Sequence, residues 1–382
     1  MKTEKLNYHL PPELIAQQPL GIRSDSRLLV LNRSKGDILD SWFSKLGDFL
    51  SPGDCLVLND TKVLPARFFA RRRTAGPKVR TGSEPPATAK LEGLFLTEAT
   101  TGIWDVMIKG TRKLKPGDML YLKGRQKDDF CKATLLEKKA DGRCRLKLKT
   151  NADAETILDR IGFPPLPPYI KRDDDPAVAQ VDKLRYQTVY AREPGAIAAP
   201  TAGLHFTNRL IGQLKQAGIY FAYITLHVGT GTFRPITEEN LKDHKIHQER
   251  FSIDEKNTRI INAAKSKGGR IIPVGTTSTR ALETVTLPTS FDTGPPGKYR
   301  RTHPGDWRIP PAGESGTTKL FIKPGYKFKI TDAMITNFHL PKSTLLALVA
   351  AFTGLENILN AYRHAIQKRY RFYSYGDAML II

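Results

Sequence analysis

Cysteine is scarce in this chain of 382 residues, which contains only Cys55, Cys131 and Cys144. No two of them form a Cys-x-x-Cys pair, so neither a disulfide framework nor a zinc cluster is indicated. Long apolar runs are also missing, because the longest notable one, residues 345–352, falls far short of the roughly 20 residues that a membrane span needs. The N-terminal segment lacks the apolar centre of a signal peptide. We therefore expect a cytoplasmic protein with no membrane partner and no bound metal.

Acidic residues are outnumbered, because 38 Asp and Glu stand against 60 Lys and Arg, a formal net charge of +22. Such a surplus favours an anionic partner, most simply nucleic acid, and the alternative is a soluble protein that is merely basic. The surplus is concentrated in residues 62–150, which hold 22 Lys and Arg and 9 Asp and Glu, a net charge of +13. The apolar and charged fractions, 40% and 26%, are typical of a globular protein, and the length suggests two or three domains.

The basic region, residues 62–150, has a sequence pattern that predicts β-structure. Short, partly alternating segments such as WDVMIK (104–109), DMLYLK (118–123) and CRLKLK (144–149) are separated by Pro-Gly, Lys-Gly and Asp-Gly pairs. This pattern is typical of a small antiparallel β-domain, a barrel or a sandwich.

The rest of the chain alternates between helix and strand patterns. Thr207 and Asp254 each precede a segment with a helical apolar stripe that they can cap. Apolar strands follow at residues 219–228 and 270–274, and a third helix is expected near Ser278. This order predicts an α/β fold with a largely parallel sheet.

The domain boundaries follow from this contrast. We predict a discontinuous α/β domain of residues 1–61 and 151–382, into which a small antiparallel β-domain of residues 62–150, a barrel or a sandwich, is inserted. Residues 74–90 and 288–316 are rich in Pro, Gly, Ser and Thr and are predicted to be loops.

Polar sequences follow several of the predicted strands, at the sheet edge where α/β proteins bind ligands. GTTSTR, residues 275–280, places a glycine, four hydroxyl groups and an arginine at a helix start, which favours an anion. The alternative is ordinary helix capping, which needs only one hydroxyl. GTGTFRP, residues 229–235, has Arg234 where a dinucleotide fingerprint needs its third glycine, so it predicts a flexible loop that can close on a polar substrate. With polar residues at other strand ends, the candidate substrate-binding residues are Thr61, Thr201, Gly229, Thr230, Gly231, Thr232, Arg234, Gly275, Thr276, Thr277, Ser278, Arg280, Asn337 and His339.

Two histidines lie near predicted junctions of strand and helix. His205 stands in the uncharged stretch AAPTAGLHFT, residues 198–207, whose small residues let another molecule approach the backbone. His227 ends the strand at 219–228. We interpret both as candidates for proton transfer, with Asp60 as a third, and the alternative for either histidine is a structural role. His244 and His247 have no third metal ligand at a useful spacing, so a polar surface or substrate contact is favoured there.

The C-terminal stretch YRHAIQKRYRFYSYGD, residues 362–377, interleaves basic and aromatic residues. Basic groups suit phosphates and aromatic rings suit unstacked bases. The alternative is a helix with a solvated basic face and an aromatic stripe that faces the core. The candidate RNA-binding residues are Arg71, Arg72, Arg73, Arg363, Lys368, Arg369 and Arg371.

The chain closely resembles the S-adenosylmethionine:tRNA ribosyltransferase-isomerase family of queuosine biosynthesis. The stretches that carry the resemblance include LVLNDTKVLPAR, YQTVYAREPGAIAAPTAGLHFT, TLHVGTGTFRP, VGTTSTRALE, FIKPGYKFKITDAMITNFHLPKSTLLALVAAF and YRFYSYGDAML, in the family's order over nearly the whole chain. Residues 74–90 and 288–316 are expanded relative to the family pattern. Lys319 stands at a position where the family commonly has an acid, so a substrate contact through that acid does not carry over to this chain. Thr279 and Ala281 also differ from the residues that are commoner in the family.

The resemblance implies a fold, a reaction and its substrates. It implies an α/β-type domain with an inserted β-barrel. It also implies transfer and isomerisation of the ribosyl moiety of S-adenosylmethionine onto 7-aminomethyl-7-deazaguanine at the tRNA wobble position. The products would be epoxyqueuosine in tRNA, adenine and methionine. S-adenosylmethionine would be a co-substrate, with no prosthetic group, and we expect a monomer. Two rivals remain: an S-adenosylmethionine-dependent RNA methyltransferase and a non-catalytic tRNA-binding protein.

Overall fold

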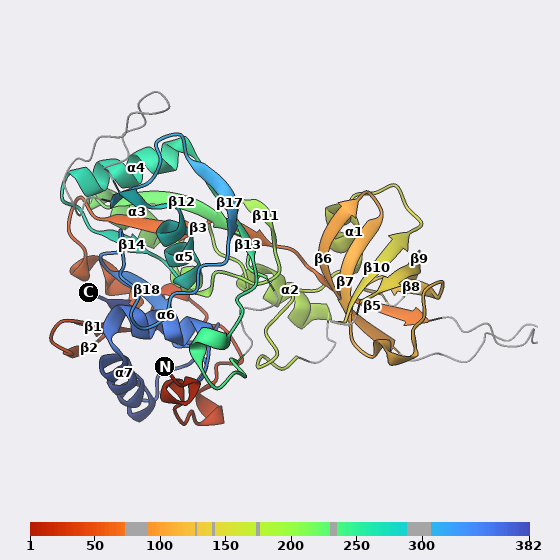
Figure 1. Cartoon of the computed structure of the whole chain (residues 1–382), viewed down its shortest axis with the longest axis horizontal. Coiled ribbons are helices and arrows are strands. Elements are labelled where there is room, and N and C mark those ends of the chain that lie inside the picture. The colour runs from red at the N-terminus through yellow and green to blue at the C-terminus, as the bar shows by residue number, and fades with distance from the viewer. Residues whose placement is uncertain (73–89, 127, 140–141, 173–175, 230–234, 289–306) are drawn as a thin grey trace, which may run out of the picture. The chain divides into compact units, whose positions relative to one another are not determined.

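The computed structural model describes residues 1–72, 90–126, 128–139, 142–172, 176–229, 235–288 and 307–382. The chain divides into two compact units (Figure 1). Unit 1 comprises Met1–Lys62, Pro167–Lys171 and Gln187–Ile382, and unit 2 comprises Val63–Leu166 and Arg172–Tyr186. Unit 2 continues past residue 150, the predicted end of the inserted domain. The reason is that Phe163 exchanges two backbone hydrogen bonds with Arg67, of 2.7 and 3.1 Å.

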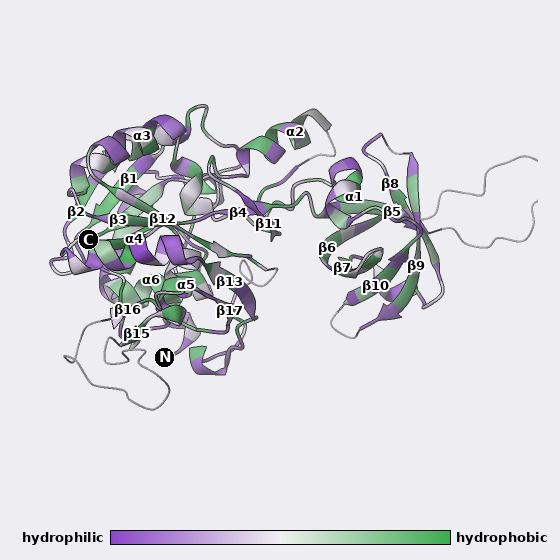
Figure 2. Ribbon diagram, turned by 90° about the horizontal axis from the view of Figure 1, so that it is seen from above, coloured by the Kyte–Doolittle hydropathy of each residue, from purple (hydrophilic) through white to green (hydrophobic). Residues whose placement is uncertain are grey.

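Unit 2 is built on a closed barrel with the strand order β10-β7-β6-β5-β8-β9, in which all neighbours are antiparallel. Its strands are β5 (Arg67–Arg72), β6 (Lys90–Thr100), β7 (Ile103–Ile108), β8 (Met119–Lys123), β9 (Asp129–Lys138) and β10 (Arg143–Leu148). Hydrophilic and hydrophobic segments alternate along the barrel strands (Figure 2), as expected when one strand face lies in the core. The predicted barrel is thereby confirmed.

Aromatic packing fills the barrel. The Trp104 ring lies 4.9 Å from the Phe95 ring and 6.1 Å from the Phe68 ring, both edge to face. A Cβ atom at Gly93 would lie 2.2 Å from the Phe68 ring, so only glycine lets β6 pass this close. Two helices complete unit 2: α1 (Ala154–Ile161), capped by the Asp153 side chain, and α2 (Pro176–Arg185).

Unit 1 contains a five-stranded sheet with the order β14-β3-β12-β13-β17 and a four-stranded sheet with the order β18-β19-β1-β2. Their strands are β1 (Arg27–Leu31), β2 (Ile38–Trp42), β3 (Cys55–Asn59), β12 (Tyr220–Leu226), β13 (Glu249–Ile253), β14 (Ile271–Pro273), β17 (Glu314–Thr318), β18 (Met334–Asn337) and β19 (Ala378–Ile381). A parallel bridge between Val274 and Ile335 joins β14 to β18, and so links the two sheets. The remaining short strands are β4 (Thr61–Val63), β11 (Glu193–Ala196), β15 (Leu287–Pro288) and β16 (Trp307–Arg308).

The mixed α/β class is confirmed. Among the described residues, parallel pairing joins β14-β3-β12 and β19-β1 and occurs in the isolated bridges Val274–Ile335 and Ile15–Phe372, so the sheets are mixed rather than largely parallel. Parallel neighbours need a crossover connection, usually helical. Between β12 and β13 the described residues contain the short 3-10 turn Leu241–Asp243 and no α-helix, and these two strands pair antiparallel. The end of the predicted loop at 288–316 instead belongs to strand β17, which pairs with β13 along five residues.

Helices of unit 1 are α3 (Asn208–Gln216), α4 (Glu255–Ser266), α5 (Thr276–Val285), α6 (Thr344–Thr353) and α7 (Leu355–Gln367). Thr207 and Asp254 cap α3 and α4 through their side chains, as predicted. Short 3-10 helices lie at Thr3–Leu6, Pro12–Leu14, Arg23–Asp25, Phe43–Phe49, Thr111–Lys113, Thr201–His205 and Leu241–Asp243. Within the described ranges no single helix has both the length and the apolar character to cross a membrane. The α6–α7 pair, bent by 113°, meets both criteria only when its two helices are joined.

Candidate functional site

Strand direction brings the predicted site residues to one edge of the unit 1 sheet. The carboxyl ends of β14, β3 and β12 lie together because these strands are parallel. β18 ends beside them, because Gly275 donates its backbone N–H to Ile335 O at 2.8 Å. We call this region the polar edge; it comprises residues 59–61, 226–229, 275–280 and 336–339.

A pocket opens at the polar edge. It is lined by six of the predicted substrate-binding residues, Thr201, Gly275, Thr276, Thr277, Asn337 and His339. Ala199, Pro200, Ala202, Val228, Thr336 and Leu345 complete the lining. Residues more than 130 positions apart in the sequence therefore share one cavity, which we call the hydroxyl pocket.

The start of α5 supplies one wall of the hydroxyl pocket. Gly275 has φ of +93° and no side chain caps the helix, so capping does not account for the four hydroxyl groups. Ser278 and Thr279 donate their hydroxyls back to the carbonyl oxygens of Val274 and Gly275, at 2.9 and 3.1 Å. The Ser278 hydroxyl is thus bonded to its own helix and its predicted substrate contact stays a prediction, whereas the two preceding threonines line the pocket.

A hydrogen-bonded chain holds Asn337 at the pocket. Thr201 donates its hydroxyl to Asn337 Oδ1 at 2.8 Å, and Asn337 Nδ2 lies 3.1 Å from His205 Nε2. An amide nitrogen can only donate, so Nε2 accepts and the His205 proton lies on Nδ1. That nitrogen lies 2.8 Å from Ser26 Oγ. These hydrogen bonds to buried partners fix the orientation of the Asn337 amide at the pocket.

His205 itself is buried and both of its ring nitrogens are engaged. Burial, followed by the nearby charges of Arg23 and Arg371, lowers the pKa of His205 to about 3. The ring therefore stays neutral near pH 7, and Ser26 and Asn337 occupy both of its nitrogens. The geometry favours a positioning role for His205 over the predicted proton transfer, because a proton carrier must reach the reacting atom.

His339 is buried in the same way. Its Nε2 atom lies 2.7 Å from Thr336 Oγ1, its backbone N–H donates to Tyr362 OH, and burial lowers the pKa of His339 to about 3. It lines the hydroxyl pocket as a neutral ring.

His227 differs from both of these histidines. Its Nδ1 atom lies 2.8 Å from Thr61 Oγ1, and no hydrogen bond joins Nε2 to any part of the chain that the structure describes. The ring lies over Gly195, where an added Cβ would meet it at 2.8 Å. Burial and the charge of Arg250 lower the pKa of His227 below its usual value, while Glu193 opposes this. His227 is thus partly exposed, neutral near pH 7 and open at one nitrogen.

Asp60 is buried and interacts with two side chains. Thr225 donates its hydroxyl to Oδ1 at 2.7 Å, and Arg192 forms an ion pair with Oδ2 at 2.9 Å. Burial raises the pKa of Asp60 above its usual value, although Thr225 and Arg192 oppose this. These partners favour a structural role over the predicted proton transfer.

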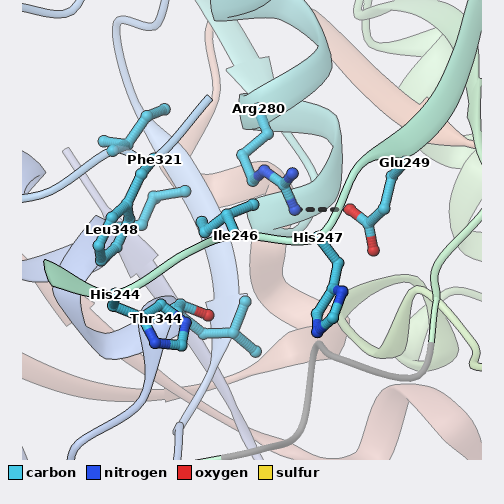
Figure 3. A pocket seen from close by; sticks show the side chains of 10 residues that line it. His244, Ile246, His247, Glu249, Arg280, Phe321, Thr344 and Leu348 are labelled. Atoms are coloured by element: carbon cyan, nitrogen blue, oxygen red, sulfur yellow. Dashed lines mark hydrogen bonds and ion pairs between the residues drawn. The ribbon is translucent and has the colours of Figure 1, made fainter. Parts of the chain in front are cut away.

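Arg280 lies in a second pocket of unit 1, shown in Figure 3. Its Nη1 atom forms a 2.5 Å ion pair with Glu249 Oε2, and both side chains are more than 90% buried. Glu249 Oε1 in turn accepts the backbone N–H of Gly229 at 3.0 Å. The anion next to Arg280 is therefore a protein carboxylate, which the sequence could not reveal because the two residues are 31 positions apart. This second pocket, the arginine pocket, is lined by His244, Ile246, His247, Glu249, Arg280, Phe321, Ile322, Thr344, Leu345 and Leu348.

His244 and His247 line the arginine pocket but do not converge on a metal. His244 Nδ1 pairs with Glu238 at 2.8 Å. No group of three His, Cys, Asp or Glu side chains suited to a metal occurs in the described ranges. A substrate contact, the favoured interpretation, stays a prediction.

Two further carboxylates and a hydroxyl went unnoticed in the sequence. Glu283 on α5 is fully buried, and its oxygens accept from Tyr326 OH, Thr331 Oγ1 and the backbone N–H groups of residues 329–331. These bonds hold the segment that leads into β18. Glu249 and Ser26 were missed for the same reason, since their partners lie 31 and 179 positions away and leave no local pattern.

The C-terminal aromatic residues do not form a stacking surface. The rings at 362, 370, 372, 373 and 375 are all buried, whereas Arg363, Lys368 and Arg369 are exposed. The alternative with a solvated basic face and core-facing rings is the one observed. Arg371 is half-buried, and it donates to Gln18 O.

Basic residues of the barrel fall into two groups. Arg71 pairs with Asp129 and Arg72 with Asp118, so neighbouring carboxylates offset both charges. Lys132, Lys147 and Lys149 are exposed, and they have no ion pair within the described part of the chain. Lys149 donates its backbone N–H to Lys132 O, and Lys147 pairs with Thr134, so all three project from the outer face of β9 and β10. We call these three residues the lysine face. Arg73, Thr230, Gly231, Thr232 and Arg234, also predicted as site residues, lie outside the described residues.

Comparisons with known proteins match the whole chain to one protein family. The model of a family described as "Queuosine biosynthesis protein" matches residues 3–381. Proteins named S-adenosylmethionine:tRNA ribosyltransferase-isomerase from Halothermothrix orenii and Staphylococcus epidermidis are 44% and 45% identical, over 100% of both chains. A solved structure of S-adenosylmethionine tRNA ribosyltransferase from Thermotoga maritima is 34% identical. It covers 99% of this chain and 100% of its own, with a TM-score of 0.50.

Proposed function

Since the chain belongs to the queuosine biosynthesis protein family and has the S-adenosylmethionine:tRNA ribosyltransferase-isomerase activity for which its relatives are named, we propose that the polar edge of unit 1 is where this reaction takes place. One observation carries the proposal. Six residues predicted from separate stretches line one pocket, at the carboxyl ends of parallel strands where α/β folds bind ligands.

The expected chemistry needs proton transfer and precise positioning more than it needs a strong nucleophile. The ribosyl moiety joins the aminomethyl group of 7-aminomethyl-7-deazaguanine at the tRNA wobble position, and methionine and adenine leave, so that epoxyqueuosine results. A base removes a proton from C5′ beside the positive sulfonium, and adenine takes up a proton as it departs. S-adenosylmethionine is consumed, so it acts as a co-substrate.

Each part of the site has a proposed role in this reaction. His227 exchanges the proton, because it is neutral near pH 7 and one ring nitrogen is open. Thr201, Thr276 and Thr277 hold the ribose hydroxyls at the uncapped start of α5. Asn337 lines the pocket in an orientation fixed by Thr201 and His205, and His205 is the positioning residue behind it. Preorganised donors of this kind stabilise developing charge without reorganising.

Unit 1 thus carries the chemistry, and we propose that the barrel of unit 2 grips the tRNA backbone through the lysine face. Exposed lysines that have no carboxylate partner among the described residues can contact phosphates, and displaced counterions then favour binding. Arg71 and Arg72 are poorer candidates than predicted, because Asp129 and Asp118 already pair with them.

The proposed reaction is tested by identifying its small products. Incubation with S-adenosylmethionine and tRNA that carries the 7-deazaguanine precursor should yield adenine and methionine in equal amounts, measured by mass spectrometry. S-adenosylhomocysteine in their place would instead identify a methyltransferase. Unconsumed S-adenosylmethionine with bound tRNA would identify a binding protein.

A further inference from the structure

Arg280 has buried hydrogen-bonding capacity that the protein does not use. Only 7% of the residue is exposed, and Nη1 is the atom that pairs with Glu249. Nε and Nη2 are buried and meet no acceptor in the part of the chain that the structure describes. These two atoms form one edge of the planar guanidinium, whose two parallel N–H groups fit both oxygens of a carboxylate. Leaving such donors unpaired is costly, so the edge is suited to a ligand.

Half of the residues that line the arginine pocket are apolar. Ile246, Phe321, Ile322, Leu345 and Leu348 line the arginine pocket together with Arg280 (Figure 3). A short unbranched aliphatic chain, such as the two methylenes between the α-carbon and the sulfur of a methionine moiety, packs well among aliphatic and aromatic side chains. The pocket therefore combines a fork for an anion with a wall for a short apolar chain.

The arginine pocket and the hydroxyl pocket share a lining residue and a helix. Leu345 lines both, and α5 contributes to both, with Thr276 and Thr277 at one and Arg280 at the other. Residues four and three positions apart lie on the same helix face, so these side chains follow one another along α5. A ligand with hydroxyl groups at one end and an anion at the other matches this order.

We propose that the Nε–Nη2 edge of Arg280 binds the α-carboxylate of the methionine moiety of S-adenosylmethionine, with the methionine side chain against the apolar wall. The inference rests on the proposed function, since it takes the ribose to lie in the hydroxyl pocket. A backbone phosphate of tRNA fits less well. Arg280 is nearly fully buried, whereas the phosphates of a folded RNA meet protein at exposed surfaces.

Decarboxylated S-adenosylmethionine tests the proposal, because it keeps the sulfonium and the adenosine but lacks the carboxylate. The measurement is kcat/KM for adenine release from each donor, with wild type and with Arg280→Gln. We expect wild type to prefer the complete donor by about 10- to 150-fold, which corresponds to a charged hydrogen-bonded contact. In Arg280→Gln this preference should fall nearly to one.

Control variants and outcomes separate a failure of the Arg280 proposal from a failure of the proposed function. Arg259→Gln, at an exposed arginine of α4 paired with Glu255, should keep the wild-type preference. Arg280→Lys keeps a charge beside Glu249 but loses the two-pronged edge, so most of the preference should disappear. Equal use of both donors by wild type would overturn the proposal even if no variant folds, as would a preference that survives in Arg280→Gln. If wild type releases adenine from neither donor, the proposed function fails instead.

Discussion

His227→Gln is expected to lower kcat for adenine release by about 10²- to 10⁴-fold, because a positioned acid or base contributes that much to proton transfer. Glutamine keeps a polar atom near Thr61 but cannot exchange a proton near pH 7. His227 is the one of the three predicted proton carriers whose open ring nitrogen and partial exposure suit the task. The His205 ring is enclosed by Ser26 and Asn337.

The role of His227 also predicts how activity depends on pH. Burial and Arg250 hold the pKa of His227 below about 6.5, so its neutral, basic form predominates at pH 7. Activity should therefore fall as the pH drops through that lowered pKa, and His227→Gln should lack this acidic limb. His9→Gln, at an exposed histidine, should match wild type in both respects. A folded His227→Gln enzyme with wild-type kcat would exclude His227 from proton transfer.

Triple substitution of the lysine face, Lys132→Gln with Lys147→Gln and Lys149→Gln, is expected to weaken tRNA binding by about 100-fold at 0.15 M salt. Each phosphate contact contributes about 0.7–0.9 to the slope of log affinity against log salt concentration, so losing three flattens the slope by about 2–3. The dissociation constant is to be measured across a range of salt concentrations. The KM for S-adenosylmethionine should change little, because the lysine face contributes to neither pocket.

A matched control guards this result against a general effect of net charge. Gln at Lys35, Lys256 and Lys267, three exposed lysines of unit 1, removes the same charge and should leave the salt slope near that of wild type. If both triple variants flatten the slope equally, the lysine face has no special part in binding. If the lysine-face variant instead loses S-adenosylmethionine and keeps tRNA, the proposed division of labour between the units is wrong.

Local patterns predicted much of this molecule. Thr207 and Asp254 cap helices as their positions indicate, since a cap depends on residues within one turn. The convergence of residues 275–280 and 336–339 follows from strand direction alone, because parallel strands end at the same edge. Alternation and turn residues likewise indicated a small antiparallel β-domain, which the structure shows to be a closed barrel.

What the sequence could not supply were partners at long range. The environment of His205 depends on Ser26 and Asn337, which lie 179 and 132 positions away, so no local pattern distinguishes a positioning histidine from a proton carrier. Glu249 and Glu283 resemble surface acids in the sequence, and only folding buries them against Arg280 and the segment at 329–331. The sequence also gives no local sign that the helix bonds the hydroxyl groups of Ser278 and Thr279 back to its own carbonyls.

Hydrogen–deuterium exchange of the whole protein, with and without saturating S-adenosylmethionine, tests the location of the reaction most directly. Ligand contacts slow the local opening that lets amides exchange. The account predicts slower exchange at residues 199–202, 227–229, 244–249 and 275–280 and at residues 336–339, with the barrel strands β5 to β10 unchanged. Protection confined to the barrel, or unchanged exchange along the polar edge, would contradict the assignment of the reaction to unit 1.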